Sequence, residues 1–408
     1  MKNNTFKHIL PVLCVMVCAV QVLHAVTLNG YLNRNGDAWY TTSEAMTVAE
    51  NVLLLQKDNG GWPKNYNKYF VPMSEEERGE AILAASNLTD ATIDNNATSS
   101  ELLFLARLYQ AARRMPAADA VPLPANPAAD NTDTNANQGI LREAAKSGPF
   151  TYGDLAEVAS KAFLKGVNFV LELQYDNGGF RQFPREYGYW KHITYNDNAM
   201  VNVMKLIGAM TAGGTDDAPD LFKELVPDDL KERLVDSYRR GIECILATQY
   251  VQSGVKTVWC AQHDEMTLLP APARSYELES LSGSESVGIV QLLMDQPDPD
   301  DRIAAAIHGA MAWFDRSRIT DKKVESFINS EGQPDRRLVE RVNGEGTDIW
   351  GRFYELDSNR VFVCDRDGII KYDMKDIGYE RRNGYSWYTS APAGLFPLYE
   401  AWKARWNK

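Results

Sequence analysis

The sequence predicts a mainly α-helical fold in which repeated helical hairpins close into a toroid or incomplete barrel, with short β elements and long loops. Apolar residues recur at helical spacing through most of the 408-residue chain. Alternating patterns typical of strands are scarce. A glycine-rich turn motif occurs more than once, and this repetition indicates that one hairpin is repeated.

The helices are predicted by apolar residues at positions i, i+3 and i+4. They are expected at Met46–Gln56, Ser99–Arg114, Leu155–Gln174, Ala199–Met210, Leu230–Gln249, Ser286–Met294, Asp301–Arg316 and Ala391–Trp406. Arg360–Cys364 is the best candidate for a strand.

The repeat consists of a turn that ends one helix and a polar cluster that begins another. The turn QKDNGGW at Gln56–Trp62 is similar to QYDNGGF at Gln174–Phe180. Glycine supplies the positive φ that ends a helix. The polar clusters follow at Thr92–Thr98 and Thr194–Met200, and a degenerate third copy spans Gln249–Trp259 and Ser282–Ser286. In a toroid of hairpins these loops gather at one end, where they can form a site.

The first 25 residues read as a secretory signal. Lys2 and Lys7 precede an apolar run that ends near Ala25 and is too short to span a membrane. We therefore expect a secreted or periplasmic protein with a single domain over 26–408. A Pro/Ala/Asn-rich insertion around 116–150 interrupts the helical pattern. A domain boundary there is the alternative, but the motifs on its two sides match each other.

Composition excludes several classes of protein. With 44% hydrophobic and 24% charged residues, the chain is globular. Its 55 acidic and 43 basic residues give a net charge of -12, which argues against nucleic-acid binding. If the protein binds an anion, it needs a local basic patch or a bridging cation.

Few residues are available for a zinc site or a disulfide framework. Beyond the signal, only Cys244, Cys260 and Cys364 remain of five cysteines, and their wide spacing leaves one disulfide open. Histidines are as scarce, so any metal should be a hard cation with oxygen ligands.

Asp94-Asn95 and Asn196-Asp197 occupy equivalent positions in the repeat. One interpretation is that these residues cap the helices that follow them. The other is that carboxylates from two repeat-related loops form a Ca²⁺ site. Each cluster is richer in Asp and Asn than one cap requires, which favours the metal.

The C-terminal region is rich in basic residues. Arginine suits bidentate recognition of carboxylates. The alternative is a salt-bridged surface, because acidic residues are interleaved. The basic residues between 352 and 382 are Arg352, Arg360, Arg366, Lys371, Lys375, Arg381 and Arg382.

Aromatic residues close to glycines could stack on sugars, although such residues more often belong to the core. They are Trp62, Phe180, Tyr187, Tyr189, Trp190, Trp387 and Tyr388.

Seven motifs together resemble the pectate lyases of polysaccharide lyase family 10. In chain order they are NGGWPKN, TIDNNAT, YDNGGFRQFP, ITYNDNAM, ARSYELESLSGSES, WGRFYELDSNRVFVCDRDG and ERRNGYSWY. The resemblance covers about Gln56 to Trp406. It implies an (α/α)3 toroid that cleaves α-1,4-linked polygalacturonate, or pectin, by Ca²⁺-assisted β-elimination. We expect the enzyme to act as a monomer.

The resemblance also implies roles for individual residues. Asp94 and Asp197 are expected to hold Ca²⁺, with Asp94 also in a catalytic role. Arg352 is expected to be the catalytic base. The expected substrate-binding residues are Lys64, Asn95, Arg274 and Arg366.

An arginine base must lose the proton that guanidinium ordinarily keeps. We expect Ca²⁺ and neighbouring arginines to favour the neutral form of Arg352. Arg360 and Lys64 remain alternative bases.

Two other classes of protein remain open. An inverting glycoside hydrolase on a similar toroid would use Asp94 and Asp197 as its acid and base, but would leave the arginine-rich motif unexplained. A non-catalytic protein that binds uronate polysaccharides would have no need of a base at Arg352.

Overall fold

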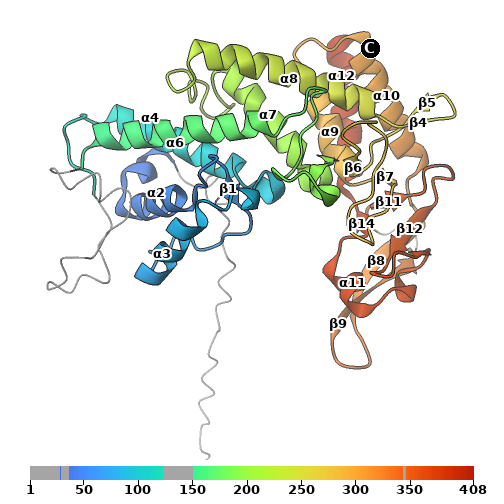
Figure 1. Cartoon of the computed structure of the whole chain (residues 1–408). Helices are drawn as coiled ribbons and strands as arrows, with labels where there is room; N and C mark the ends of the chain where they lie inside the picture. Colours follow the sequence, from blue (N-terminus) through green and yellow to red (C-terminus); the bar gives the residue numbers. More distant parts are fainter. Residues whose placement is uncertain (1–27, 29–35, 123–149, 343–345) are drawn as a thin grey trace, which may run out of the picture.

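The computed structural model describes residue 28 and residues 36–122, 150–342 and 346–408. Helices dominate these ranges and most strands are very short, which confirms the mainly α-helical prediction (Figure 1). The predicted signal at 1–25 and most of the predicted insertion at 116–150 lie outside the described residues. Within the described part, no helix has the length and apolar character needed to cross a membrane.

Every predicted helix is present, with ends that differ by a few residues. Two helices were missed because one is largely polar and the other is short. The helices are α2 (Ser43–Leu55), α3 (Glu75–Ala84), α4 (Ser99–Arg114), α6 (Tyr152–Glu172), α7 (Ala199–Ala212), α8 (Asp228–Thr248), α9 (Glu285–Met294), α10 (Asp301–Arg316), α11 (Tyr379–Gly384) and α12 (Leu395–Trp406).

The strands pair antiparallel, and most have two residues. β8 (Lys322–Ile328) and β9 (Pro334–Glu340) form a longer hairpin that the sequence analysis missed, whereas the expected strand at Arg360–Cys364 is present as β12 (Val361–Cys364). β12 lies in a four-stranded sheet with β13 (Ile370–Lys371), β11 (Phe353–Tyr354) and β7 (Leu281–Ser282). The remaining pairs are β1 (Trp62–Pro63) with β2 (Ala91–Thr92), β3 (Ile193–Thr194) with β6 (Gln262–His263), β4 (Val251–Gln252) with β5 (Val255–Lys256), and β10 (Trp350–Gly351) with β14 (Tyr388–Thr389).

One glutamine side chain anchors each of the three repeated turns. The Nε2 group of Gln56 donates to the backbone oxygens of Gly60 in its own turn and Ala162 on α6. Gln174 donates in the same way to Gly178 and to Ser237 on α8.

The third copy follows the same rule although its sequence has diverged. Gln249 donates to the backbone oxygens of Thr257 and of Ala306 on α10, each at 2.8 Å. The repeat predicted from sequence is therefore structural, because each turn is fastened to a later helix by one amide.

The glycines of the first two turns lie against helix backbone. Gly178 has φ +88°, and a Cβ there would lie 2.0 Å from the backbone oxygen of Arg240 on α8. Gly60 has φ +100°, and a Cβ there would lie 2.3 Å from the backbone oxygen of Lys165 on α6. These positions therefore require glycine for two reasons, conformation and space.

Helices that contact one another follow the repeat. α4 packs on α6, α7 on α8, and α9 on α10, while α12 contacts both α9 and α10. α4, α7 and α9 each begin where a polar loop ends. In Figure 1, α2 and α3 lie on one side of the molecule and the C-terminal strands lie on the other.

Gly178→Ala should destabilise the protein more than Gly254→Ala does. Gly254 has a similar φ of +83° but has no atom within 4 Å of an added Cβ. Both changes incur the cost of a left-handed L-residue, roughly 1–2 kcal/mol. Gly178→Ala adds a backbone clash, so its free energy of unfolding should be lower by a further ~1–3 kcal/mol. Urea unfolding measures both variants, and equal losses would contradict the packing argument.

Candidate active site

Three polar loops meet at the N-terminal ends of α4, α7 and α9. The first contains the short 3-10 helix η3 (Asp94–Asn96), the second contains η6 (Asn196–Asn198), and the third runs from β7 to Glu285. η3 contacts η6, and η6 contacts α9. The structure therefore brings the two predicted Asp/Asn clusters together and adds the third copy of the loop.

The first two loops are held in an unusual backbone conformation. Asn95 has φ 53° and the equivalent Asp197 has φ 51°, both in the left-handed region. Asn and Asp tolerate this region better than most residues, and such strain is concentrated at functional sites.

The interpretation of Asp94 and Asp197 as helix caps is wrong. The N-cap residues of α4 and α7 are Thr98 and Asn198, and neither helix has a side-chain cap hydrogen bond. The left-handed residues turn the chain before each helix begins, so the two carboxylates make other contacts.

Asp94 is almost buried and has an unsatisfied oxygen. Its side chain is 7% exposed, and its Oδ2 lies 2.5 Å from Nζ of Lys64. Its Oδ1 is buried with no hydrogen-bond partner among the described residues. Beside it, the Asn95 amide donates to Oδ1 of Asn65 at 2.9 Å. Because a buried carboxylate oxygen without a partner is costly, this oxygen is a candidate ligand for a cation.

Arg352 joins the second loop to the third. Its Nη2 donates to Oδ1 of Asn196 at 3.0 Å and lies 3.3 Å from Oδ1 of Asp197. The same nitrogen forms a buried ion pair with Glu285, whose other carboxylate oxygen accepts from the Ser282 hydroxyl. Nε of Arg352 is buried and has no partner among the described residues.

The surroundings of Arg352 favour its charged form. Burial alone would lower the pKa of the guanidinium, but the carboxylates of Glu285 and Asp197, with the phenol of Tyr385, hold this pKa above its ordinary value. The expectation that neighbouring arginines lower the pKa is therefore wrong for this arrangement. Among the charged groups, the nearby carboxylates have the larger effect.

Two tyrosine rings gather the arginines next to this centre. Tyr276 and Tyr385 meet edge to face, with centroids 5.4 Å apart. Arg352 lies 4.6 Å from the Tyr385 centroid, and Arg274 lies 5.0 Å from that of Tyr276. Guanidinium groups at these distances are attracted to the ring faces. Two further arginines complete this arginine cluster, Arg366 at 5.6 Å and Arg381 at 4.4 Å from Tyr276.

Carboxylates hold the cluster in place. Arg274 pairs with Glu277, which also accepts a hydrogen bond from the Tyr385 hydroxyl at 2.7 Å. Arg366 and Arg381 share Glu380. The Arg366 side chain is 63% exposed and pairs with Glu380, so the interpretation of this region as a salt-bridged surface is correct for Arg366. That exposure also leaves it accessible to a substrate.

The other basic residues of the C-terminal region lie in different surroundings. Arg360 stacks on Tyr372 with 3.2 Å between the guanidinium carbon and the ring centroid, and among the described residues it makes no contact with the polar loops. Arg382 pairs with the buried Asp335 and fastens α11 to β9. Arg352 rather than Arg360 therefore reaches the site.

Glu285, Arg381 and Tyr385 were missed as site residues. Glu285 had a detectable signal, because it lies in the third copy of the repeat, at Ser282–Ser286. Tyr385 had none beyond its position in ERRNGYSWY, since only the fold brings its ring to Arg352 and Arg274.

Within the described residues, the group of His and acidic side chains spaced for a metal is His192, Asp264 and Glu265. It does not include Asp94 or Asp197. Nζ of Lys191 already lies 2.6 Å from Glu265. His263 is structural, because it is fully buried and burial lowers its pKa to about 4. The three described cysteines, Cys244, Cys260 and Cys364, are free and buried.

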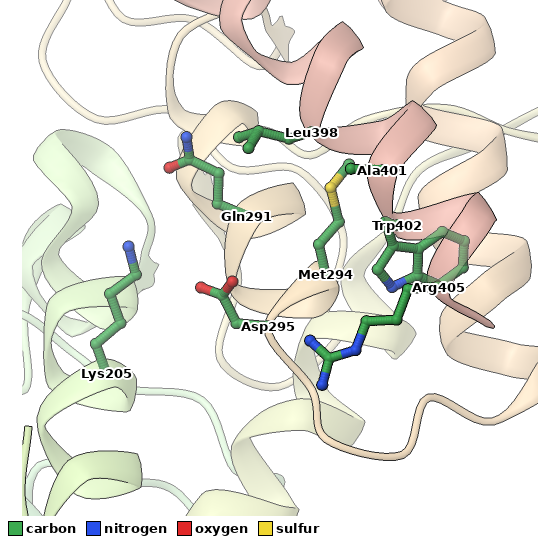
Figure 2. Close-up of a pocket in the computed structure, with 8 residues that line it drawn as sticks. All are labelled: Lys205, Gln291, Met294, Asp295, Leu398, Ala401, Trp402 and Arg405. Atoms are coloured by element: carbon green, nitrogen blue, oxygen red, sulfur yellow. The ribbon is translucent and has the colours of Figure 1, made fainter. Parts of the chain in front are cut away.

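A separate pocket lies between α7, α9 and α12 (Figure 2). Its volume is about 290 Å³, and Lys205 lies across it from Asp295 and Arg405. It contains none of the predicted site residues, so we place the active site at the polar loops.

Comparison with known proteins gives a consistent family. The chain matches the family described as Pectic acid lyase over residues 56–123 and 150–396. A family 10 polysaccharide lyase from Cellvibrio cellulosa is 29% identical, with a TM-score of 0.64, and the match covers 93% of this chain and 97% of that one. A mutant of a family 10 polysaccharide lyase from the same organism, in complex with trigalacturonic acid, matches with the same identity and TM-score over 92% of this chain and 97% of that one. No curated protein matches the chain.

The fold and the site, taken with these matches, define a polysaccharide lyase. The chain belongs to the pectic acid lyase family. This assignment favours a lyase over the glycoside hydrolase and the non-catalytic binding protein that the sequence had left open.

Glu285→Gln should lower the free energy of unfolding by about 3–5 kcal/mol, because it leaves the buried Arg352 charge poorly compensated. Glu285→Gln combined with Arg352→Met should cost less than the sum of the single changes, since the double variant buries no unpaired charge. Urea unfolding of the wild type, the two single variants and the double variant measures the coupling free energy between Glu285 and Arg352. Strict additivity would show that the pair is not coupled.

Proposed function

We propose that the protein is a secreted or periplasmic pectate lyase that cleaves α-1,4-linked polygalacturonate by Ca²⁺-assisted β-elimination, with Arg352 as the base. The observation that carries the proposal is the position of Arg352. Its guanidinium lies at the polar loops, between Asp197 and Glu285, and on the ring that also contacts Arg274. We also propose the (α/α)3 toroid, because the described helices pack as the pairs α4–α6, α7–α8 and α9–α10.

The chemistry explains why basic groups surround the site. β-Elimination removes the proton at C5, next to the uronate carboxylate, and expels the glycosidic oxygen at C4. The neighbouring carboxylate must then carry more negative charge in an enolate-like transition state. Cationic groups placed on that carboxylate stabilise the developing charge.

Several side chains are suited to hold the substrate. Arg274 and Arg366 present guanidinium groups that can bind uronate carboxylates. Lys64 and Asn95 lie at the first loop, where Nζ of Lys64 contacts Asp94. We assign these four residues to substrate binding.

The polar loops also fit a hard cation. Asp94 and Asp197 would hold Ca²⁺, because Oδ1 of Asp94 is buried without a partner and Asp197 lies in the adjacent loop. Oδ1 of Asp94 and the Asp197 carboxylate are oxygen donors of the kind that Ca²⁺ prefers. When bound, the ion would add positive charge beside the uronate carboxylate. In this arrangement Asp94 also belongs to the catalytic centre.

Arg352 can accept the C5 proton only through its neutral form. Glu285 and Asp197 hold its pKa above the ordinary arginine value, so the neutral fraction is small at neutral pH. While the pH stays below this pKa, each rise of one pH unit increases the neutral fraction tenfold. The rate should therefore rise with pH throughout the alkaline range in which the protein stays folded.

Incubation with polygalacturonate and Ca²⁺ should produce a rising ultraviolet absorbance from the conjugated 4,5-unsaturated end, and a chelator should abolish it. The physical reason is that the uronate carboxylate needs the extra positive charge. Reducing ends without absorbance would indicate hydrolysis and recast Asp94 and Asp197 as acid and base. Activity that persists after chelation would remove Ca²⁺ from the proposal.

Arg352→Ala should abolish lyase activity while polygalacturonate binding persists, because Arg274 and Arg366 remain. The wild-type log(kcat/KM) should rise with a slope of about one per pH unit above neutral pH. Arg360→Ala is the matched control and should keep its activity, since Arg360 stacks on Tyr372.

Circular dichroism must first show that Arg352→Ala folds, because the change leaves Glu285 without its cation. Full activity of a folded Arg352→Ala variant would exclude this residue as the base.

A further inference from the structure

We infer that Arg185, Tyr187 and Trp190, which we call the aromatic surface, bind a uronate unit of the polymer outside the reacting bond. The inference rests on the proposed function, and it assigns the next part of the substrate to a place on the protein. The aromatic surface lies in the chain between the second repeated turn and β3.

The aromatic surface is fastened directly to the first polar loop. The backbone oxygen of Gln182 accepts hydrogen bonds from the Thr92 hydroxyl at 2.6 Å and from the Ile93 amide at 3.1 Å. Nζ of Lys64, which contacts Asp94, also lies 5.6 Å from the Phe183 centroid. Phe183 itself is buried and lies against Arg185, so a polymer chain that leaves the site past Lys64 approaches the aromatic surface at Arg185.

Arg185 is held between two aromatic rings. Its guanidinium carbon lies 4.6 Å from the Phe183 centroid and 4.7 Å from that of Trp190. Nε donates to the backbone oxygen of Thr89 at 2.9 Å, and Nη2 lies 3.5 Å from Asp90. Among the described residues nothing accepts a hydrogen bond from Nη1. The side chain is thus pre-oriented, and part of its donor edge can bind a carboxylate.

Tyr187 offers an exposed ring against Trp190, the ring that the Arg185 guanidinium also contacts. Its residue exposure is 61%, and its ring meets Trp190 edge to face at 5.5 Å and 88°. Gly188, with φ +62°, makes the turn that holds Tyr187 and Trp190 in this arrangement. An exposed aromatic ring next to a fixed cation can contact both the apolar face of a sugar and its carboxylate.

The aromatic residues that the sequence offered for sugar stacking differ in how far they are buried. Trp62 and Phe180 are fully buried, and Trp387 is 1% exposed, so they belong to the core. Tyr187 is the exposed member of that set, which places the sugar-stacking interpretation on this surface.

Charge also favours an anionic sugar here. Residues 181–191 carry three basic side chains and one acidic side chain, within a chain of net charge -12. Lys191 is compensated by Glu265 and Arg181 by Glu186. Arg185 has the more distant contact with Asp90, so it retains the most capacity for a ligand carboxylate.

The test compares Tyr187→Ala on polygalacturonate and on trigalacturonate. We expect KM for the polymer to rise roughly 3- to 10-fold with kcat unchanged, since one exposed stacking contact is lost. The rise in KM should be smaller on trigalacturonate, because a trimer has only one unit beyond the two that flank the reacting bond. Tyr372→Ala is the matched control, since Tyr372 is 43% exposed and also lies against a guanidinium, that of Arg360.

An unchanged KM for the polymer would overturn the inference. An equal rise in KM for polymer and trimer would also overturn it, because that result indicates a general change in the site. If the wild-type protein forms no unsaturated product, the proposed function itself fails and this inference falls with it.

Discussion

The buried guanidinium of Arg352 is the interaction on which the arrangement of the site depends. Its side chain contacts Asn196 and Asp197 in the second loop and Glu285 in the third. Its backbone amide donates to Trp387 and its backbone oxygen accepts from Gly283. One residue therefore connects two helical repeats with the C-terminal strands. A buried charge is tolerated only with partners, so the three segments are constrained to meet.

The same constraint creates a conflict for catalysis. The carboxylates that make a buried arginine stable also hold it in its charged form, whereas a base must be neutral. A cation that engages Asp197 would weaken one of these attractions. The site thus couples ligand binding to the basicity of Arg352 through a shared carboxylate.

Much of the scaffold was predictable from the sequence, because local rules determine it. Apolar periodicity located the helices, and the repeated QxDNGG motif located turns whose glutamines and glycines make the same contacts in two copies. The capping interpretation failed because Thr98 and Asn198, which follow the predicted residues in the chain, take the N-cap positions. The roles of Tyr385 and Glu285 come from contacts with residues far apart in the chain, and of the two only Glu285 had a signal in the repeat.

The strained loops explain why the helical repeat and the site belong together. Asn95 and Asp197 occupy left-handed conformations that cost free energy, and such conformations persist only when the surrounding structure enforces them. The surrounding structure is held together by the repeated turns, each of which is fixed to a later helix by a glutamine amide. The fastened helices α6, α8 and α10 pack on α4, α7 and α9, the helices that the polar loops precede. The diverged third copy retains the glutamine bridge but presents Glu285 instead of an Asp/Asn pair. The third copy thus has the same scaffold contact, while its loop supplies the carboxylate that pairs with Arg352.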